Sequence, residues 1–382
     1  MERIDRAPQS GRRRIVRLVH LSLGLVLGLW VVLVSLTGSL IVFREELENA
    51  LRPGLTRVSP GGEWTPLQPV FDRVRSAFPG ATFHTVNLPT APDRSLSFWG
   101  HDASGRSFHA YVNPFSGELL GSDLADDNLT EWIYLFHAQL LGGGTGERIN
   151  GLGVLAWVAL LGSGLVLWLP RSSRRWREGF GVRWRAQWRR RWYDVHRAVG
   201  VWGAVPLLVV SVTGAYFPFQ GPFRWLAETV TGSRAAEDSP RPPVRAAATP
   251  WVSLDAVLKT ASRVLPEAPP NWIHLPAHDA DVFTVRKRLP GEWRLEGANH
   301  LHVDPATGEL LRADLHADRT PAQRLMRSMF PLHAGTFGGL GTRIAWVVLG
   351  WLPAVLFLSG FVLWWRRLSP PSKSVPGASP PL

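Results

Sequence analysis

The stretch RLVHLSLGLVLGLWVVLVSLTGSLIVF, from Arg17 to Phe43, occurs again in altered form as YDVHRAVGVWGAVPLLVVSVTGAYF, from Tyr193 to Phe217. Each copy has a histidine near its start, a glycine four residues later and a Ser-x-Thr-Gly motif near its far end. The matched residues are His20 and His196, Gly24 and Gly200, and Gly38 and Gly214. The 18-residue step from His20 to Gly38 is a whole number of helical turns, so both lie on one helix face. A histidine above a groove of small residues is what a flat macrocycle needs against a membrane helix.

Four stretches without formal charge are long enough to cross a bilayer, so we expect four transmembrane helices. They divide the chain into nine parts. These are an N-terminal segment (1–17), a first span (18–43), a first long segment (44–145), a second span (146–170), a basic loop (171–194), a third span (195–219), a second long segment (220–340), a fourth span (341–366) and a tail (367–382).

The net charge of +12 is concentrated in the short segments. Residues 1–17, 171–197 and 366–382 contain 19 of the 42 basic residues and only four of the 30 acidic ones. Short basic segments typically remain on the cytoplasmic side of a membrane. We therefore expect both termini in the cytoplasm and both long segments across the membrane. Contact with membrane lipid explains the basic segments better than nucleic-acid binding does, so we expect no nucleic-acid partner.

The chain contains no cysteine. This excludes disulfides, cysteine-ligated iron–sulfur clusters, thiolate catalysis and covalent attachment of haem through Cys-x-x-Cys-His. Any redox centre must therefore be held by other side chains.

The two long segments repeat one order of elements. Each has an amphipathic helix, then alternating strands, then a second amphipathic helix just before a membrane span. SGELLG matches TGELLR, and LFHAQLLGGGTGERI matches PLHAGTFGGLGTRI. We therefore predict a tandem duplication of helix, small α+β domain and helix. Because each half starts and ends on the same side of the membrane, the halves are expected to be parallel repeats.

Matched histidines are the candidate ligands of a redox centre. His137 corresponds to His333 just outside the membrane, as His20 corresponds to His196 near the cytoplasmic side. Paired imidazoles at equal depth suit bis-histidine ligation, so we expect two non-covalent b-type haems. Gly24 and Gly200 should flank the inner haem, and Gly38 and Gly214 the outer one. The alternatives are hydrogen-bonded interfacial histidines and, with a weak signal, zinc.

Several of these segments resemble those of a known family. The segments NPFSGELLG and HVDPATGELLR, the helix VHRAVGVWGAVPLLVVSVTG and the final PLHAG segment are similar to those of PepSY-associated transmembrane-helix proteins. This family includes iron-regulated inner-membrane reductases of Gram-negative bacteria, among them ferrioxamine siderophore reductases. The resemblance implies a multi-pass bacterial inner-membrane protein with periplasmic PepSY-like domains. It also implies haem-dependent reduction of a ferric siderophore, with iron ligands at His20, His196, His137 and His333.

A ferric siderophore, expected to be of the hydroxamate type, would release its iron after one-electron reduction, because hard oxygen ligands hold Fe(II) far more weakly than Fe(III). This chemistry requires no acid–base pair or nucleophile, and we expect no catalytic residue of that kind. The natural substrate site is a cleft between the two periplasmic domains. Its candidate residues are His109, Tyr111, His300 and His302. The cytoplasmic parts are too short for a nucleotide-binding domain, so the electron donor is a quinol, a reduced flavin or a partner reductase.

Two other functions remain open from the sequence. One is a quinol-oxidising b-type cytochrome with a different electron acceptor. The other is a non-enzymatic, membrane-anchored PepSY module that binds a protein partner.

Overall fold

The computed structural model describes residues 11–124, 127–169, 176–235, 251–276, 281–292, 294 and 296–368. The chain forms two compact units. The first, here called the helical unit, comprises Met1–Ser39, Ile149–Ala215 and Val347–Leu382. The second, here called the sheet unit, comprises Leu40–Arg148 and Tyr216–Trp346.

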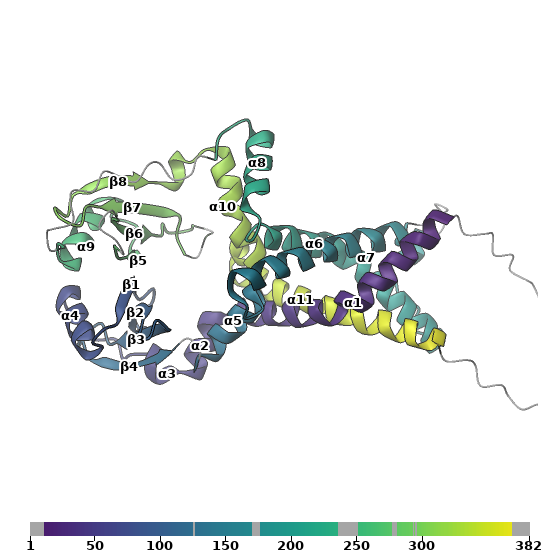
Figure 1. Ribbon diagram of the computed structural model, residues 1–382, viewed down its shortest axis with the longest axis horizontal. Helices are drawn as coiled ribbons and strands as arrows, with labels where there is room; N and C mark the ends of the chain where they lie inside the picture. The colour runs from purple at the N-terminus through teal and green to yellow at the C-terminus, as the bar shows by residue number, and fades with distance from the viewer. Residues whose placement is uncertain are drawn as a thin grey trace, which may run out of the picture. The chain divides into compact units, whose positions relative to one another are not determined.

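Four long helices supply the helical unit (Figure 1). They are α1 (Gly11–Ile41), α6 (Gly143–Trp168), α7 (Trp188–Ala215) and α11 (Gly339–Leu368). All four are long and apolar enough to cross a membrane, which confirms the prediction of four candidate spans. Helix α7 begins at Trp188, inside the predicted loop 171–194, because its first turns contain neither proline nor glycine.

Small residues bring the membrane helices close together. A Cβ at Gly28 of α1 would lie 2.1 Å from the Phe357 ring of α11, and one at Gly153 of α6 would lie 2.6 Å from the Trp30 ring. Such close approach at glycine is typical of helix packing in membranes, where dispersion contacts replace the hydrophobic effect.

The sheet unit contains one antiparallel sheet of eight strands in the order β4-β3-β2-β1-β5-β6-β7-β8. The strands are β1 (Thr82–Asn87), β2 (Leu96–His101), β3 (Ser107–Val112), β4 (Leu119–Leu124), β5 (Pro270–His274), β6 (Phe283–Lys287), β7 (Asn299–Val303) and β8 (Leu310–Asp314). The two long segments were expected to form two separate small domains. They instead share this sheet, because β1 pairs with β5 and places Val86 opposite Ile273. Each segment therefore covers the free strand edge of the other.

Helices α4 (Leu67–Ala77) and α9 (Leu254–Arg263) contribute to a single core with one face of the sheet. The alternation of the strands directs Phe98, Phe283 and their neighbours into this core. The two helices also cap each other. The Asp255 carboxylate accepts hydrogen bonds from the backbone N–H groups of Leu67 (2.7 Å) and Gln68 (2.9 Å), while the Gln68 side chain accepts one from Leu254 N–H (2.9 Å).

The remaining elements are mostly short. They are α2 (Arg44–Leu51), α3 (Pro53–Thr56), α5 (Leu129–Gln139), α8 (Gln220–Thr231), α10 (Pro321–Ala334), η3 (Arg177–Gly179), η4 (His316–Asp318) and η5 (Thr336–Gly338). Helices α5 and α10 are the predicted amphipathic helices before the second and fourth spans. Helix α10 starts with a capping box formed by Thr320 and Gln323 and ends at Gly335, whose φ of 70° suits glycine. Helices α2 and α8, which follow the first and third spans, were not predicted.

Candidate functional site

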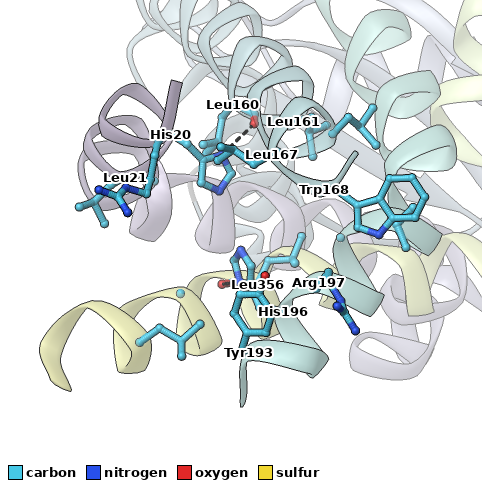
Figure 2. A pocket seen from close by; sticks show the side chains of 18 of the residues that line it. His20, Leu21, Leu160, Leu161, Leu167, Trp168, Tyr193, His196, Arg197 and Leu356 are labelled. Carbon is cyan, nitrogen blue, oxygen red and sulfur yellow. Dashed lines mark hydrogen bonds between the residues drawn. The ribbon is translucent and has the colours of Figure 1, made fainter. Parts of the chain in front are cut away.

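His20 of α1 and His196 of α7 face each other within the helical unit. Their ring centres are 6.2 Å apart and their planes cross at 85°. Figure 2 shows the two rings pointing toward one another from different helices. The structure therefore brings together the two histidines that the repeated stretch matched.

Each ring is held on its Nδ1 side by the next membrane helix. His20 Nδ1 lies 2.9 Å from Ser163 Oγ and 3.3 Å from the Leu160 carbonyl oxygen. His196 Nδ1 lies 2.9 Å from Ser359 Oγ and 3.0 Å from the Leu356 carbonyl oxygen. A carbonyl oxygen can only accept, so Nδ1 carries the proton in both neutral rings. The lone pair of each Nε2 is then available to a metal.

The two serines complete this arrangement. The hydroxyl groups of Ser163 and Ser359 donate to carbonyl oxygens of their own helices, so they accept from the imidazoles. Behind each serine is a glycine, Gly164 or Gly360, where a Cβ would lie 3.2 Å from the imidazole Cε1. The sequence repeats these Ser-Gly pairs in GSGLVLW and LSGFVLWW, but the repetition alone assigned them no function.

A cavity of about 920 Å³ contains both histidines. It is at the upper end of the size range of cofactor and ligand pockets. Gly24, Gly200 and Trp157 line it together with Leu160 and Leu356. Gly38 and Gly214 belong to α1 and α7 but do not line this cavity, so their place beside the outer pair stays a prediction.

The spacing of the rings can be compared with that of an iron site. Two imidazoles on opposite sides of one metal ion place their ring centres about 6.3 Å apart, given metal–nitrogen bonds of about 2 Å and a ring radius of about 1.15 Å. The observed 6.2 Å agrees with this value. The protonation of Nδ1, the spacing and the size of the cavity all fit a bis-histidine haem.

The second matched pair lies in the sheet unit. His137 near the end of α5 and His333 near the end of α10 have ring centres 6.0 Å apart and planes inclined at 40°. The Phe217 ring packs edge-on against His333 at 5.4 Å. Trp346 fixes the end of α10, because its indole N–H donates to the Leu332 carbonyl oxygen at 2.9 Å. The 6.0 Å spacing of this pair is close to the 6.2 Å of the first.

The candidate substrate residues share the sheet face opposite α4 and α9. In register across the sheet, Asp123 lies opposite His109, and Asp314 lies opposite His300. Strands β3 and β7 are five strand spacings apart, or about 24 Å along the sheet. The structure therefore places His109 and Tyr111 far from His300 and His302. It does not place these residues in a cleft between two domains, because the two long segments form one sheet.

Tyr111 and His302 form side-chain hydrogen bonds, whereas His109 lies near a carboxylate without a hydrogen bond to it. His109 Nδ1 lies 3.3 Å from Asp123 Oδ1, and His302 Nε2 lies 3.0 Å from Asp314 Oδ2. The Tyr111 hydroxyl donates to Glu48 Oε1 at 3.0 Å. Burial raises the pKa of Tyr111 well above its usual value.

Two histidines on this face stay neutral over a wide pH range. Burial lowers the pKa of His109 to about 4, with further contributions from nearby arginines. Burial lowers the pKa of His300 to about 3. The guanidinium groups that lower it further belong to Arg327, Arg319, Arg286 and Arg294. This half of the polar face is thus rich in positive charge.

Comparison with known proteins assigns the chain to a family. No curated protein matches the chain. The family model described as the PepSY-associated TM region matches residues 17–367, which include all four long helices almost completely and the whole sheet. The chain therefore belongs to the PepSY-associated transmembrane family.

Proposed function

We propose that this protein is a di-haem membrane reductase that delivers electrons to a ferric siderophore and releases Fe(II). The observation that carries the proposal is the spacing of the two histidine pairs, 6.2 Å for His20 and His196 and 6.0 Å for His137 and His333. His84 and His274 of the sheet also lie 6.4 Å apart, so the spacing gains its weight from the repeat: each of the two pairs consists of matched residues of the two halves of the chain.

In this proposal each pair holds one non-covalent b-type haem. When bound, haem supplies reversible one-electron transfer without proton chemistry. The protein's own part is to fix the ligands. Ser163 and Ser359 orient the inner imidazoles, and Gly24 and Gly200 leave room at the walls of the cavity.

The reaction itself needs no catalytic side chain. One electron converts the bound Fe(III) to Fe(II), and no bond of the siderophore breaks. The polar face of the sheet, with His109, Tyr111, His300 and His302, is the proposed docking surface for a hydroxamate-type ferric siderophore. The donor is a quinol, a reduced flavin or a partner reductase.

The membrane arrangement is part of the same proposal. The basic short segments support cytoplasmic termini in a bacterial inner membrane, with the sheet unit in the periplasm. A tandem parallel duplication accounts for the repeated element order of the sheet, in which β1–β4 and β5–β8 are both meanders. It also accounts for the equal anchoring of His20 and His196.

The test begins with purified full-length protein and its visible spectrum. We expect a Soret band that shifts on reduction, as for b-type haem. Anaerobic addition of a ferric hydroxamate siderophore should re-oxidise the reduced protein, while a ferrous-specific chelator traps the released iron. His196→Ala and His333→Ala should each remove about half of the haem, as one ligand pair of two is broken. His101→Ala, at an exposed strand end, is the matched control.

The outcomes separate the alternatives. Protein without a Soret band after haem reconstitution would refute the reductase and favour a non-enzymatic binding module. If other acceptors, but not ferric siderophore, re-oxidise the haem, the result would support a quinol-oxidising cytochrome instead.

A further inference from the structure

The lining of the cavity of the helical unit is apolar in one part and basic in another. The apolar part consists of the His20 and His196 imidazoles, glycines and apolar side chains. The basic part contains, among the described residues, the carboxylate of Glu178 and six arginines. The arginines are Arg13, Arg17, Arg183, Arg190, Arg197 and Arg367. Six guanidinium groups beside an apolar space call for an anionic partner.

A buried carboxylate organises three of these arginines. Asp194, which is 0% exposed, lies 3.3 Å from Arg183 Nε, 3.0 Å from Arg190 Nε and 3.2 Å from Arg197 Nη2. Glu178 Oε2 also lies 4.0 Å from Arg183 Nη2, so two negative charges face three positive charges and leave a surplus of one. The guanidinium groups are thus held in place without being neutralised, which is the arrangement of a pre-organised anion site.

The segment that carries Arg183 is itself fixed to the membrane helices. The Trp168 indole N–H donates to the Gly179 carbonyl oxygen at 3.3 Å, and the Trp202 indole N–H donates to that of Phe180 at 3.1 Å. The Phe180 ring packs against both indoles, at 5.0 and 5.3 Å. These contacts attach Gly179 and Phe180 to helices α6 and α7.

We propose that these arginines bind the carboxylate groups of the macrocycle whose iron His20 and His196 ligate. The inference rests on the proposed function for the presence of haem, and adds the recognition of its anionic edge. A ligand with one apolar body and two carboxylates matches this lining, whereas an uncharged quinone supplies no negative charge to the arginines. Arg197, next to His196 in the chain, joins the two parts of the site. Asp194 is a positioning residue that acts through the arginines.

The experiment compares haem with its dimethyl ester, which keeps the iron and the ring but lacks the two charges. Both are titrated into detergent-purified full-length apoprotein. The part of the Soret change that the His196→Ala variant lacks is the signal of the inner site. We expect the wild-type inner site to bind haem about tenfold or more tightly than the ester, because charged hydrogen bonds are lost. Arg197→Gln should lower this ratio toward one. Arg17→Gln, which is not tied to Asp194, should lower it partly.

Arg189→Gln, an exposed arginine of α7 outside the cavity, should keep the wild-type ratio. Equal binding of haem and ester by the wild type would overturn the inference while leaving haem ligation intact. An equal effect of Arg189→Gln would also overturn it, since the preference would then be a general charge effect. Phospholipid phosphate retained by the wild type but not by Arg197→Gln, with equal porphyrin affinities, would assign the arginines to lipid instead. Absence of any Soret band with either porphyrin refutes the proposed function itself.

Discussion

Replacing the serines behind the inner histidines should weaken haem binding by different amounts. Loss of an outer partner of a ligating histidine typically costs about 10–100-fold in affinity. In Ser163→Ala, His20 Nδ1 keeps only the Leu160 carbonyl oxygen at 3.3 Å, beyond the usual length of an N–H···O bond. In Ser359→Ala, His196 Nδ1 keeps the Leu356 carbonyl oxygen at 3.0 Å. We therefore expect about 100-fold weaker binding for Ser163→Ala and about tenfold for Ser359→Ala.

The assay is a haem titration of detergent-purified apoprotein, followed by the Soret absorbance. The titration of His196→Ala, which retains only the outer pair, is subtracted to leave the signal of the inner site. Ser211→Ala is the control, because its hydroxyl donates only to the Leu207 carbonyl oxygen of its own helix. Its inner-site affinity should equal that of the wild type. Unchanged haem affinity in both Ser163→Ala and Ser359→Ala would refute the conclusion that the serines fix the proton on Nδ1 of each histidine. A larger loss in Ser359→Ala than in Ser163→Ala would refute the reasoning from the second acceptor.

Three further predictions concern the sheet unit and are read from the apparent melting temperature. Lys287 is 1% exposed and donates to the carbonyl oxygens that end α9, at 2.7–2.8 Å, so Lys287→Met should cost about 3 kcal/mol and about 6–12 °C. Asp255→Ala uncaps α4 and should cost about 1–2 kcal/mol. The pKa of His300, about 3, is depressed below its unfolded value of about 6.5, so its stabilising effect is present above pH 6.5 and is lost as the pH falls toward 3. His300→Gln should therefore flatten the loss of stability in acid.

Matched controls make these three results specific. Lys259→Met on the exposed face of α9 and Glu309→Gln in the turn before β8 should each change the melting temperature little. Ser107→Ala, at the exposed start of β3, removes no titrating group and should leave the acid dependence of the wild type unchanged. A melting temperature of Lys287→Met equal to that of the wild type would contradict the capping role of the lysine. An acid slope unchanged by His300→Gln would contradict the assignment of that slope to His300.

Local patterns were sufficient to predict the membrane helices, the strands and the histidine pairs, but not helices α2 and α8. Alternation in SFHAYV separates Phe108 and Val112, which face the core, from His109 and Tyr111, which face away. Repetition of the stretch around His20 and His196 was enough to match those residues, since equal depth in a bundle follows from equal position in a repeat. Helix α10 likewise followed from its apolar spacing.

The sequence did not predict that the two long segments share one sheet. The β1–β5 pairing depends on which strand edges remain free, and no local pattern encodes that choice. The exchange of caps between Gln68 and Asp255 depends on the same docking, because each side chain serves the other helix. The cluster around Asp194 was missed for a related reason. Arg183 reaches Asp194 only because the Trp168 and Trp202 indoles fix the intervening segment.

The inner pair depends on two separate helix contacts. His20 is oriented by α6 and His196 by α11, so each ligand brings its own support from the same half of the chain. Their rings reach ligation distance only where α1 and α7 lie side by side. A ligand that binds only this folded arrangement stabilises it by about 4 kcal/mol at a free concentration 1,000 times its dissociation constant. Haem loading should therefore raise the unfolding temperature of the helical unit, and His196→Ala should abolish this rise. The cost of Lys287→Met in the sheet unit should be the same with and without haem. If haem protected the His196→Ala variant equally, the inner pair would not be its binding site.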